Sequence, residues 1–275
     1  MRTDTATVTE IRPTSPWTSG LGDVWTRREL LYFLAWRDVK VRYKETLLGV
    51  AWAVVQPLAA MVIFTVIFSR FAGLPSDGQP YALWSYTGLV PWMYMANVMT
   101  QGAGSLVNNA ALVSKVYFPR LIVPLAASLS GMVDLTVGLG LLVPLMMWYG
   151  VVPGPAVLLL PIMLLLAVIV ASGVGLWLSA LNVKYRDVRH VVPFMTQLWL
   201  FVTPVVYPSS VLSEPWRTLS GLNPMAGVVE GMRWALLATP PAWWLVLLSS
   251  IVAVTLLIGG LVYFRSVEGD FADLV

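Results

Sequence analysis

Side chains that could carry out acid–base or metal chemistry are sparse in this chain of 275 residues. There is no cysteine, and the single histidine, His190, lies in the polar stretch LNVKYRDVRHVVPF between long apolar runs. A zinc site needs several Cys, His or carboxylate ligands, and a thiolate nucleophile needs a cysteine. No nucleophile and base stand at a recognisable spacing. We therefore expect no catalytic, cofactor-binding or metal-ligating residues, and we expect the chain not to be an enzyme.

The sequence also has no recognisable nucleotide-binding motif. The sequence lacks the G-x-x-x-x-G-K-[ST] loop whose backbone N–H groups hold nucleotide phosphates. If the protein drives transport, the energy must come from another polypeptide.

Asp134 is an acid in the middle of an apolar run, SGMVDLTVG. Burying a carboxylate in a membrane is costly unless it is paired, so such a residue suggests a function. The sequence places no Lys or Arg at the same depth, and we expect a protonated or hydrogen-bonded Asp134 that bridges helices through Gln56, Gln197 or Ser172. A proton relay is the alternative.

The elements that must position these residues are membrane helices. Apolar residues make up 58% of the chain and charged residues 11%, and the mean hydropathy is +0.77. A soluble domain has about 25% charged residues, whereas a membrane span needs about 20 apolar residues in a row. We predict an all-α membrane protein with a six-helix transmembrane domain over 47–264. The spans are expected at 47–69, 81–101, 121–149, 156–181, 191–212 and 242–264.

The distribution of cations orients these spans. If the N-terminus is cytoplasmic, 14 of the 17 Lys and Arg residues fall on the cytoplasmic side. The remaining three are Arg70, Arg217 and Arg233. The positive-inside rule therefore places both termini in the cytoplasm, including a C-terminal tail at 265–275. The basic pI of about 9.2 follows from this topology, and it does not indicate a nucleic-acid partner.

The N-terminal segment divides into a mobile tail, 1–22, and an amphipathic interface helix, 23–46. Thr26 and Glu29 form a capping-box pattern that predicts the start of the helix. The positions that we expect to form one apolar stripe on the membrane surface are Tyr32, Ala35, Trp36, Val39 and Tyr43. This helix is either a lipid anchor alone or an anchor that also contacts a cytoplasmic partner.

Two polar connections on the cytoplasmic side interrupt the apolar runs. The first, at 108–120, carries Val116, Tyr117 and Phe118, and exposed apolar groups in a loop suggest that a partner covers them. The alternative is that they lie in the lipid headgroup layer. The second connection is the stretch around His190.

The outer connection between the last two spans is of intermediate polarity. Asn223 before Pro224 predicts a helix start. Glu230 and Arg233 are three residues apart and are expected to meet on that helix. We predict short re-entrant helices at about 213–240, which form either the lid of a pathway or a shield over the helices.

Four blocks of sequence resemble a known family: RYKETLLGVAWAVVQPL, SLVNNAALVSKVYFPRLIVPL, LNVKYRDVRHVVPFMTQLWLFVTPVVYP and LNPMAGVVEGMRWALL. In this order, from about 26 to 265, they are similar to the membrane subunits of type-2 ATP-binding-cassette exporters of cell-surface polysaccharides. The resemblance implies a homodimer in the bacterial inner membrane, with two copies of a cytoplasmic ATPase. ATP and Mg²⁺ are then expected on that ATPase and not on this chain. The implied substrate is a lipid-linked polysaccharide, with O-antigen favoured.

The resemblance also implies roles for individual residues, with a coupling helix at about 104–120. Residues expected to contact the ATPase are Lys115, Val116, Tyr117, Phe118, Arg120, Arg37 and Lys40. A cytoplasmic gate or lipid-diphosphate contact is expected at Lys184, Tyr185, Arg186, Asp187 and Arg189. Aromatic residues expected along the substrate path are Trp92, Tyr94, Trp199 and Tyr207, each of which could instead be a core residue. The outer gate is expected at Asn223, Glu230 and Arg233.

Several other functions compete with this one. An exporter of drugs or small lipids would have the same fold, because fold does not fix substrate. An ion-coupled carrier usually shows internal repeats and a midplane ion site, whereas Asp134 stands alone. A membrane enzyme of glycan assembly should have clustered acids, Arg or His in its outer loops. A passive scaffold is the fourth possibility.

Overall fold

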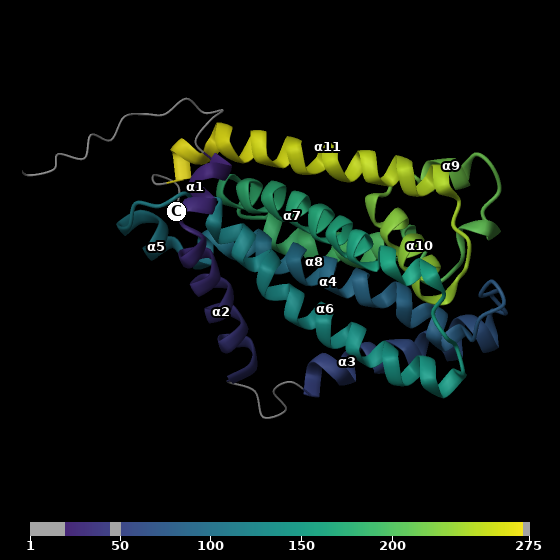
Figure 1. The fold of residues 1–275 in the computed structure, drawn as a ribbon. Coiled ribbons are helices and arrows are strands. Elements are labelled where there is room, and N and C mark those ends of the chain that lie inside the picture. The colour runs from purple at the N-terminus through teal and green to yellow at the C-terminus, as the bar shows by residue number, and fades with distance from the viewer. Residues whose placement is uncertain (1–19, 45–50, 272–275) are drawn as a thin grey trace, which may run out of the picture.

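The computed structural model describes residues 20–44 and 51–271, and within these ranges every regular element is a helix. In Figure 1, α4, α6, α7 and α11 run side by side, α2 crosses one end of them, and α9 and α10 lie toward the other end. The elements are α1 (Gly20–Thr26), α2 (Arg28–Lys44), α3 (Ala51–Phe64), a π-helix (Thr65–Phe71), α4 (Tyr81–Asn108), α5 (Ala110–Lys115), α6 (Ile122–Tyr149), a 3-10 turn (Pro155–Leu159), α7 (Leu160–Lys184), α8 (Val188–Val202), a 3-10 turn (Ser209–Val211), α9 (Trp216–Ser220), α10 (Pro224–Leu237), α11 (Trp243–Val267) and a 3-10 turn (Glu268–Asp270).

Four helical stretches of the described residues are long and apolar enough to cross a membrane. They are Ala51–Phe71, Ile122–Tyr149, Pro155–Lys184 and Trp243–Val267. The helix α4 has 28 residues but a lower hydropathy, since polar side chains follow one of its faces. The all-helical membrane fold is therefore confirmed, and four of the six expected spans meet both criteria.

The fifth expected span, 191–212, is shorter than predicted. The helix α8 has 15 residues, which correspond to about 22 Å, less than the roughly 30 Å of a bilayer core. It ends because Thr203 has extended backbone angles, φ −87° and ψ 138°. Thr203 precedes Pro204, and the proline ring disfavours the helical conformation of the residue before it.

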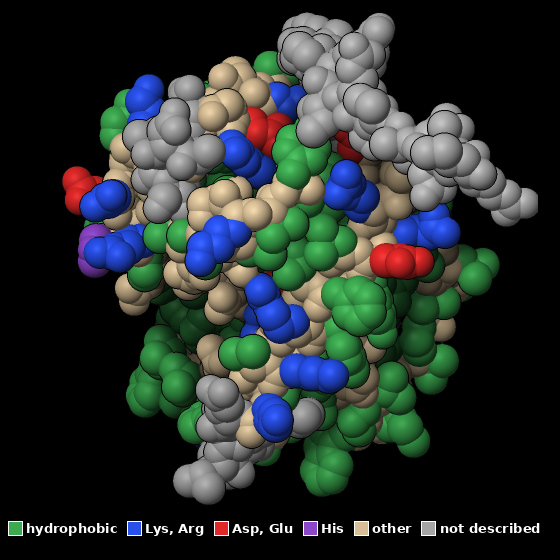
Figure 2. Space-filling view, turned by 90° about the vertical axis from the view of Figure 1, so that its left-hand side faces the viewer, with side chains coloured by type: hydrophobic (Ala, Val, Ile, Leu, Met, Phe, Trp, Pro, Cys, Tyr) green, Lys and Arg blue, Asp and Glu red, His purple; other side chains and the backbone are tan. Residues whose placement is uncertain are grey.

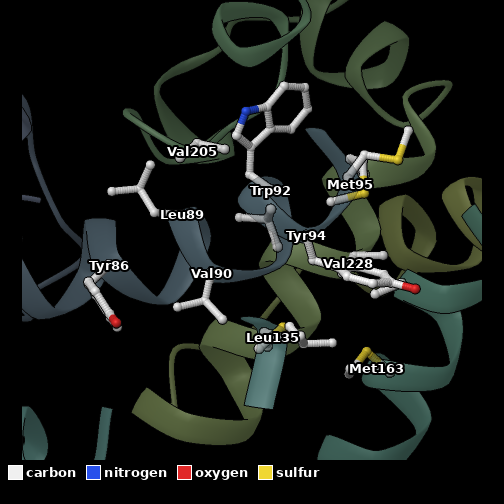
Figure 3. Close-up of a cluster of buried hydrophobic side chains, with 14 of the residues drawn as sticks. Tyr86, Leu89, Val90, Trp92, Tyr94, Met95, Leu135, Met163, Val205 and Val228 are labelled. Carbon is white, nitrogen blue, oxygen red and sulfur yellow. The ribbon is translucent and has the colours of Figure 1, made fainter. Parts of the chain in front are cut away.

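The main hydrophobic core surrounds α4. Figure 3 shows its buried side chains, which come from α4, from α6 and α7, and from the segments around α8 and α10. Glycines allow α4 and α7 to approach closely, because a Cβ on Gly102 would lie 3.1 Å from Cα of Gly175. The backbone of α4 is thus fixed by helices on several sides.

A second group of buried side chains, the end cluster, joins distant parts of the chain at one end of the molecule. It includes Val24, Leu34, Phe118, Phe264 and Phe271. Phe264 and Phe271 meet edge to face with centroids 5.1 Å apart. The first helices, the 108–120 connection and the last described residues are therefore packed together, at the end marked C in Figure 1.

The N-terminal helix begins earlier than predicted, and the capping-box prediction is wrong. Thr26 ends α1, and its hydroxyl donates to the Gly22 carbonyl at 2.9 Å instead of capping α2. Most of the predicted tail, 1–19, and residues 45–46 of the predicted interface helix lie outside the described residues.

The predicted apolar stripe of this helix is divided between two faces. Ala35 and Val39 are buried, whereas Tyr32 is 62% exposed and Trp36 is 45% exposed. The helix α2 packs against α6. The buried side chains of α2 are Leu34, Ala35 and Val39, and the bulky aromatic side chains face outward, where a membrane interface would accept them.

Candidate functional site

The acid in the middle of α6 has partners that the sequence did not suggest. Asp134 accepts hydrogen bonds from the Arg42 guanidinium and the Tyr43 hydroxyl, and from Nδ2 of Asn97 at 2.7 Å. The expectation that no cation lies at its depth, and that Gln56, Gln197 or Ser172 is its partner, is therefore wrong. The pair joins α2 to α6, and Asn97 adds α4.

Arg42 reaches Asp134 because α2 packs against α6 and because an arginine stem can run along apolar surface. The pair is about a quarter exposed, so it is only partly desolvated. Burial and the bond donated to Asp134 raise the pKa of Tyr43 to about 12, so its hydroxyl stays a donor. Through these contacts Asp134 joins α2 and α4 to α6.

Two cavities lie beside this ion pair, between α2, α4 and α6. The larger cavity, of about 540 Å³, also reaches α3, and Asp134 lies in its lining. The smaller, of about 420 Å³, extends past Asn108 toward the end of the molecule that carries the end cluster. Arg42 and Gln101 line both, so the cavities are neighbours.

The end face of the molecule is rich in cations. Figure 2 shows Lys and Arg side chains spread across this face, with few acids between them. The exposed cations include the predicted contact residues Lys40, Lys115, Lys184, Arg186 and Arg189, and Arg37 is paired with its neighbour Asp38 at 2.7 Å. A surface of this charge attracts an acidic partner or anionic lipid headgroups.

The connection at 108–120 presents some of its predicted contact residues and buries another. Tyr117 is 76% exposed and Val116 is also exposed, whereas Phe118 is 5% exposed and belongs to the end cluster. The prediction that Phe118 contacts a partner from the surface is therefore wrong. Phe118 packs among the apolar residues of the end cluster, so the large apolar side chains of this connection that a partner could cover are Val116 and Tyr117.

Neighbouring segments fix this connection in place. Nη1 of Arg27 donates to the Tyr117 carbonyl at 3.3 Å, and the backbone N–H of Arg120 donates to Oε1 of Glu268 at 3.1 Å. The Arg120 guanidinium also donates to the Glu268 carbonyl. Burial raises the pKa of the Glu268 carboxyl, and the contacts with Arg120 oppose that shift. The predicted contact residue Arg120 thus holds the C-terminal segment.

The connection between α7 and α8 is exposed. Nζ of Lys184 lies 5.5 Å from the Tyr185 ring centroid, and Arg186 and Asp187 face outward. Asp187 precedes α8, but its side chain does not cap that helix. These residues form an exposed polar surface.

At the opposite end of the molecule, the predicted start of α10 is confirmed. Oδ1 of Asn223 accepts from the backbone N–H of Met225 at 3.0 Å, and Pro224 is the first helical residue. The same oxygen accepts from Nε1 of Trp199 at 3.0 Å, and Nδ2 donates to the Thr203 hydroxyl at 2.9 Å. Asn223 therefore fixes the end of α8 against the start of α10.

Arg233 is a buried cation, 1% exposed, in the same region. It lies 3.6 Å from Glu230, as the spacing predicts, and its guanidinium carbon is 3.3 Å from the Trp84 ring centroid. It also donates to the carbonyls of Pro204 and Val205 at 2.6 and 2.8 Å. Because the chain is not helical at Pro204 and Val205, their carbonyls have no donor from a following helical turn, and Arg233 supplies one to each. It is a structural cation and no surface charge.

The four aromatic residues expected along a substrate path do not form one open track in this subunit. Trp92 and Tyr94 are buried in the core, where Trp92 meets Trp199 edge to face at 6.2 Å. The Tyr94 hydroxyl donates to the Ser128 carbonyl at 3.1 Å, and Tyr207 is half-buried. Of these residues, Tyr94 lies in the lining of the larger cavity.

The residues that the sequence analysis missed are Arg42, Tyr43 and Asn97. A signal for Asn97 is present, because Asn97, Gln101, Ser105 and Asn108 recur every three to four residues and so lie on one face of α4. A polar face on an otherwise apolar helix indicates a polar neighbour. The identity of that neighbour requires the packing of α2 against α6.

Comparison with known proteins adds a family to this geometry. The family model described as ABC-2 type transporter matches residues 29–237. The O-antigen export system permease protein RfbA of Myxococcus xanthus is 29% identical over 213 residues, which cover 77% of this chain and 81% of that protein. The permease of the same name from Klebsiella pneumoniae is 27% identical over 248 residues, or 90% and 95% of the two chains. The polysialic acid transport protein KpsM of Escherichia coli is 21% identical over 205 residues, or 73% and 78%.

Proposed function

The chain belongs to the ABC-2 type transporter family, and from this membership we propose that it is the membrane subunit of an exporter of lipid-linked cell-surface polysaccharide. The observation that carries the proposal is the similarity to O-antigen export permeases over as much as 90% of the chain. Since the match covers 90% of this chain and 95% of that permease, it is not confined to a part of either protein. O-antigen is the favoured substrate.

The energy for export comes from a separate ATPase in this proposal. The sequence has no nucleotide-binding loop of its own, and its basic end face offers a surface for a cytoplasmic partner. The exposed Val116 and Tyr117 lie within the expected coupling element, and Lys115 lies next to them. Two copies of the ATPase would bind one membrane dimer.

The proposed assembly is a homodimer of six-helix subunits in the inner membrane, with both termini in the cytoplasm. The apolar face of α8 supports a dimer, because this helix is largely exposed and has one buried residue, Val192. A second copy beside α8 would cover its apolar side. With 15 residues, α8 is also too short to cross the bilayer on its own. The outer helices α9 and α10 would form the re-entrant gate.

An accumulation experiment tests the transported class. Cells that lack the protein should accumulate lipid-linked polysaccharide on the cytoplasmic side, and the wild-type gene should relieve this. If the cells export the polymer normally and instead retain a drug or a small lipid, the related exporter function is correct.

A reconstitution experiment tests the source of energy. The chain and its candidate ATPase are placed in vesicles together, and movement of a labelled lipid-linked glycan is measured with ATP. We expect transport only when both proteins and ATP are present. Pumping by the membrane chain alone would overturn the proposal.

A further inference from the structure

The larger cavity beside Arg42 and Asp134 has the size of a small-molecule site. Ligand sites usually have volumes of about 300 to 1,000 Å³, and this cavity has a volume of about 540 Å³. Its lining comes from α2, α3, α4 and α6, so it lies at the depth of the membrane helices. Polar groups at this depth that do not face protein must face water or a ligand.

Two amide side chains in the lining have no protein partner among the described residues. Gln56 of α3 and Gln101 of α4 are both exposed, and neither side chain forms a hydrogen bond with another described residue. Asn97, by contrast, is occupied by Asp134. An amide carries two donor hydrogens and an acceptor oxygen, so the two glutamines offer unused capacity for hydroxyl groups.

An aromatic ring stands next to one of these amides. Trp52 is 51% exposed and lies one helical turn before Gln56, so the ring and the amide share a face of α3. A pyranose has an apolar C–H face that packs on an aromatic ring and a rim of hydroxyls that bind amides. The combination of Trp52, Gln56 and Gln101 matches both parts of that chemistry.

The charge of the cavity distinguishes a sugar from a phosphate. Arg42 is the basic residue in the lining, and it is already paired with Asp134. The pair has no net charge, so it offers hydrogen bonds without attracting an anion strongly. A neutral, hydroxyl-rich ligand therefore fits better than a diphosphate or an acidic lipid headgroup.

We propose that the cavity lined by Trp52, Gln56 and Gln101 is a binding site for a sugar unit of the lipid-linked substrate. The inference rests on the proposed export of a glycan, and it adds a site within one subunit. The site is separate from the basic end face and from the Trp92–Trp199 contact.

Binding measurements on the complete complex test this site. The chain and its ATPase are purified together in lipid nanodiscs, and the affinity for a labelled lipid-linked oligosaccharide is measured. Gln56→Met and Gln101→Met remove the amides at nearly constant volume, and each should weaken binding about fivefold, as expected for a neutral hydrogen bond. Trp52→Leu should weaken it further. The control Trp148→Leu changes an exposed tryptophan at the C-terminal end of α6, which is not part of the cavity lining. This variant should bind the oligosaccharide with wild-type affinity.

Three outcomes would contradict either the sugar site or the proposed exporter function. Wild-type affinity in both glutamine variants, with ATP-driven glycan transport intact, would overturn the sugar site and leave the exporter function standing. If a polyprenyl phosphate without sugar shows the same loss of affinity in these variants, the cavity recognises phosphate and the inference is wrong. If the wild-type complex neither binds nor moves the glycan, the proposed function itself fails.

Discussion

Arg42 at the end of α2 is paired with Asp134 in the middle of α6, 92 residues away in sequence. Near the opposite end of the same helical segment, Arg27 donates to the carbonyl of Tyr117. The helix α2 is thus attached to the 108–120 connection at one end and to a membrane helix at the other. These two contacts fix the position of α2 relative to both elements.

Breaking this ion pair should destabilise the protein. Asp134→Asn or Arg42→Gln leaves one charge without its partner, and we expect each to cost about 2 kcal/mol, less than the roughly 3–5 kcal/mol of a fully buried pair. The double variant should recover much of that loss, because no isolated charge remains. Thermal unfolding of the four proteins in detergent measures the coupling.

Asp134→Leu extends the test to the proton-relay alternative. It removes the acceptor of three hydrogen bonds and should be the least stable variant. If Asp134→Asn has normal stability and abundance but does not transport, the pair hypothesis is wrong and a protonation role gains support.

The sequence was sufficient to predict the helical membrane fold, the start of α10 and the contact between Glu230 and Arg233. Each of these depends on local signals, namely apolar run length, a cap followed by proline, and a three-residue spacing. Membership of the family was likewise accessible from ordered sequence blocks.

The partners of Asp134 and the burial of Phe118 could not be predicted in the same way. Both depend on how α2 packs against α6 and how the chain's C-terminal segment returns to the 108–120 connection. Hydropathy places a residue by its depth in a span, and Arg42 lies before the first span. Hydropathy therefore gives no indication that the long Arg42 side chain of α2 reaches Asp134 in α6.

Replacing Arg233 should disturb the outer end of the molecule. Arg233→Met keeps much of the stem but removes the donors to Pro204 and Val205, so two buried carbonyls lose their bonds. We expect a cost of about 3 kcal/mol or more, since each unsatisfied buried group costs about 1–3 kcal/mol. Lysine should not restore stability, because its single ammonium cannot reproduce the planar fork.

Limited proteolysis of the segment that follows α8, combined with thermal unfolding, would measure this effect. The matched control is Arg70→Met, which changes an exposed arginine after α3. Equal stability of the Arg233 and Arg70 variants would show that the buried contacts contribute little.

Glu268 should make stability depend on pH. Because burial raises the pKa of its carboxyl, the folded chain holds this proton more tightly than the unfolded chain does. The contribution of Glu268 to the free energy of unfolding is then greatest below the ordinary carboxyl pKa of about 4.3 and falls as pH rises through the raised value. Glu268→Gln removes that decline, so from about pH 4 to 7 the variant should lose less stability than the parent. If the melting temperatures of Glu268→Gln and of the parent protein change in parallel with pH, Glu268 is not the source of this pH dependence.

Tyr117 and Phe118 are adjacent, but their substitutions should have different effects. Phe118→Ala creates a cavity in the end cluster and should cost about 3–5 kcal/mol, as is typical for a buried Phe. Tyr117→Ala removes an exposed ring and should leave membrane insertion and thermal stability unchanged while reducing the amount of ATPase that co-purifies. Tyr149→Ala, an exposed tyrosine at the far end of α6, is the control and should retain the ATPase. If Tyr117→Ala retains as much ATPase as that control, the 108–120 connection does not bind its partner through this ring.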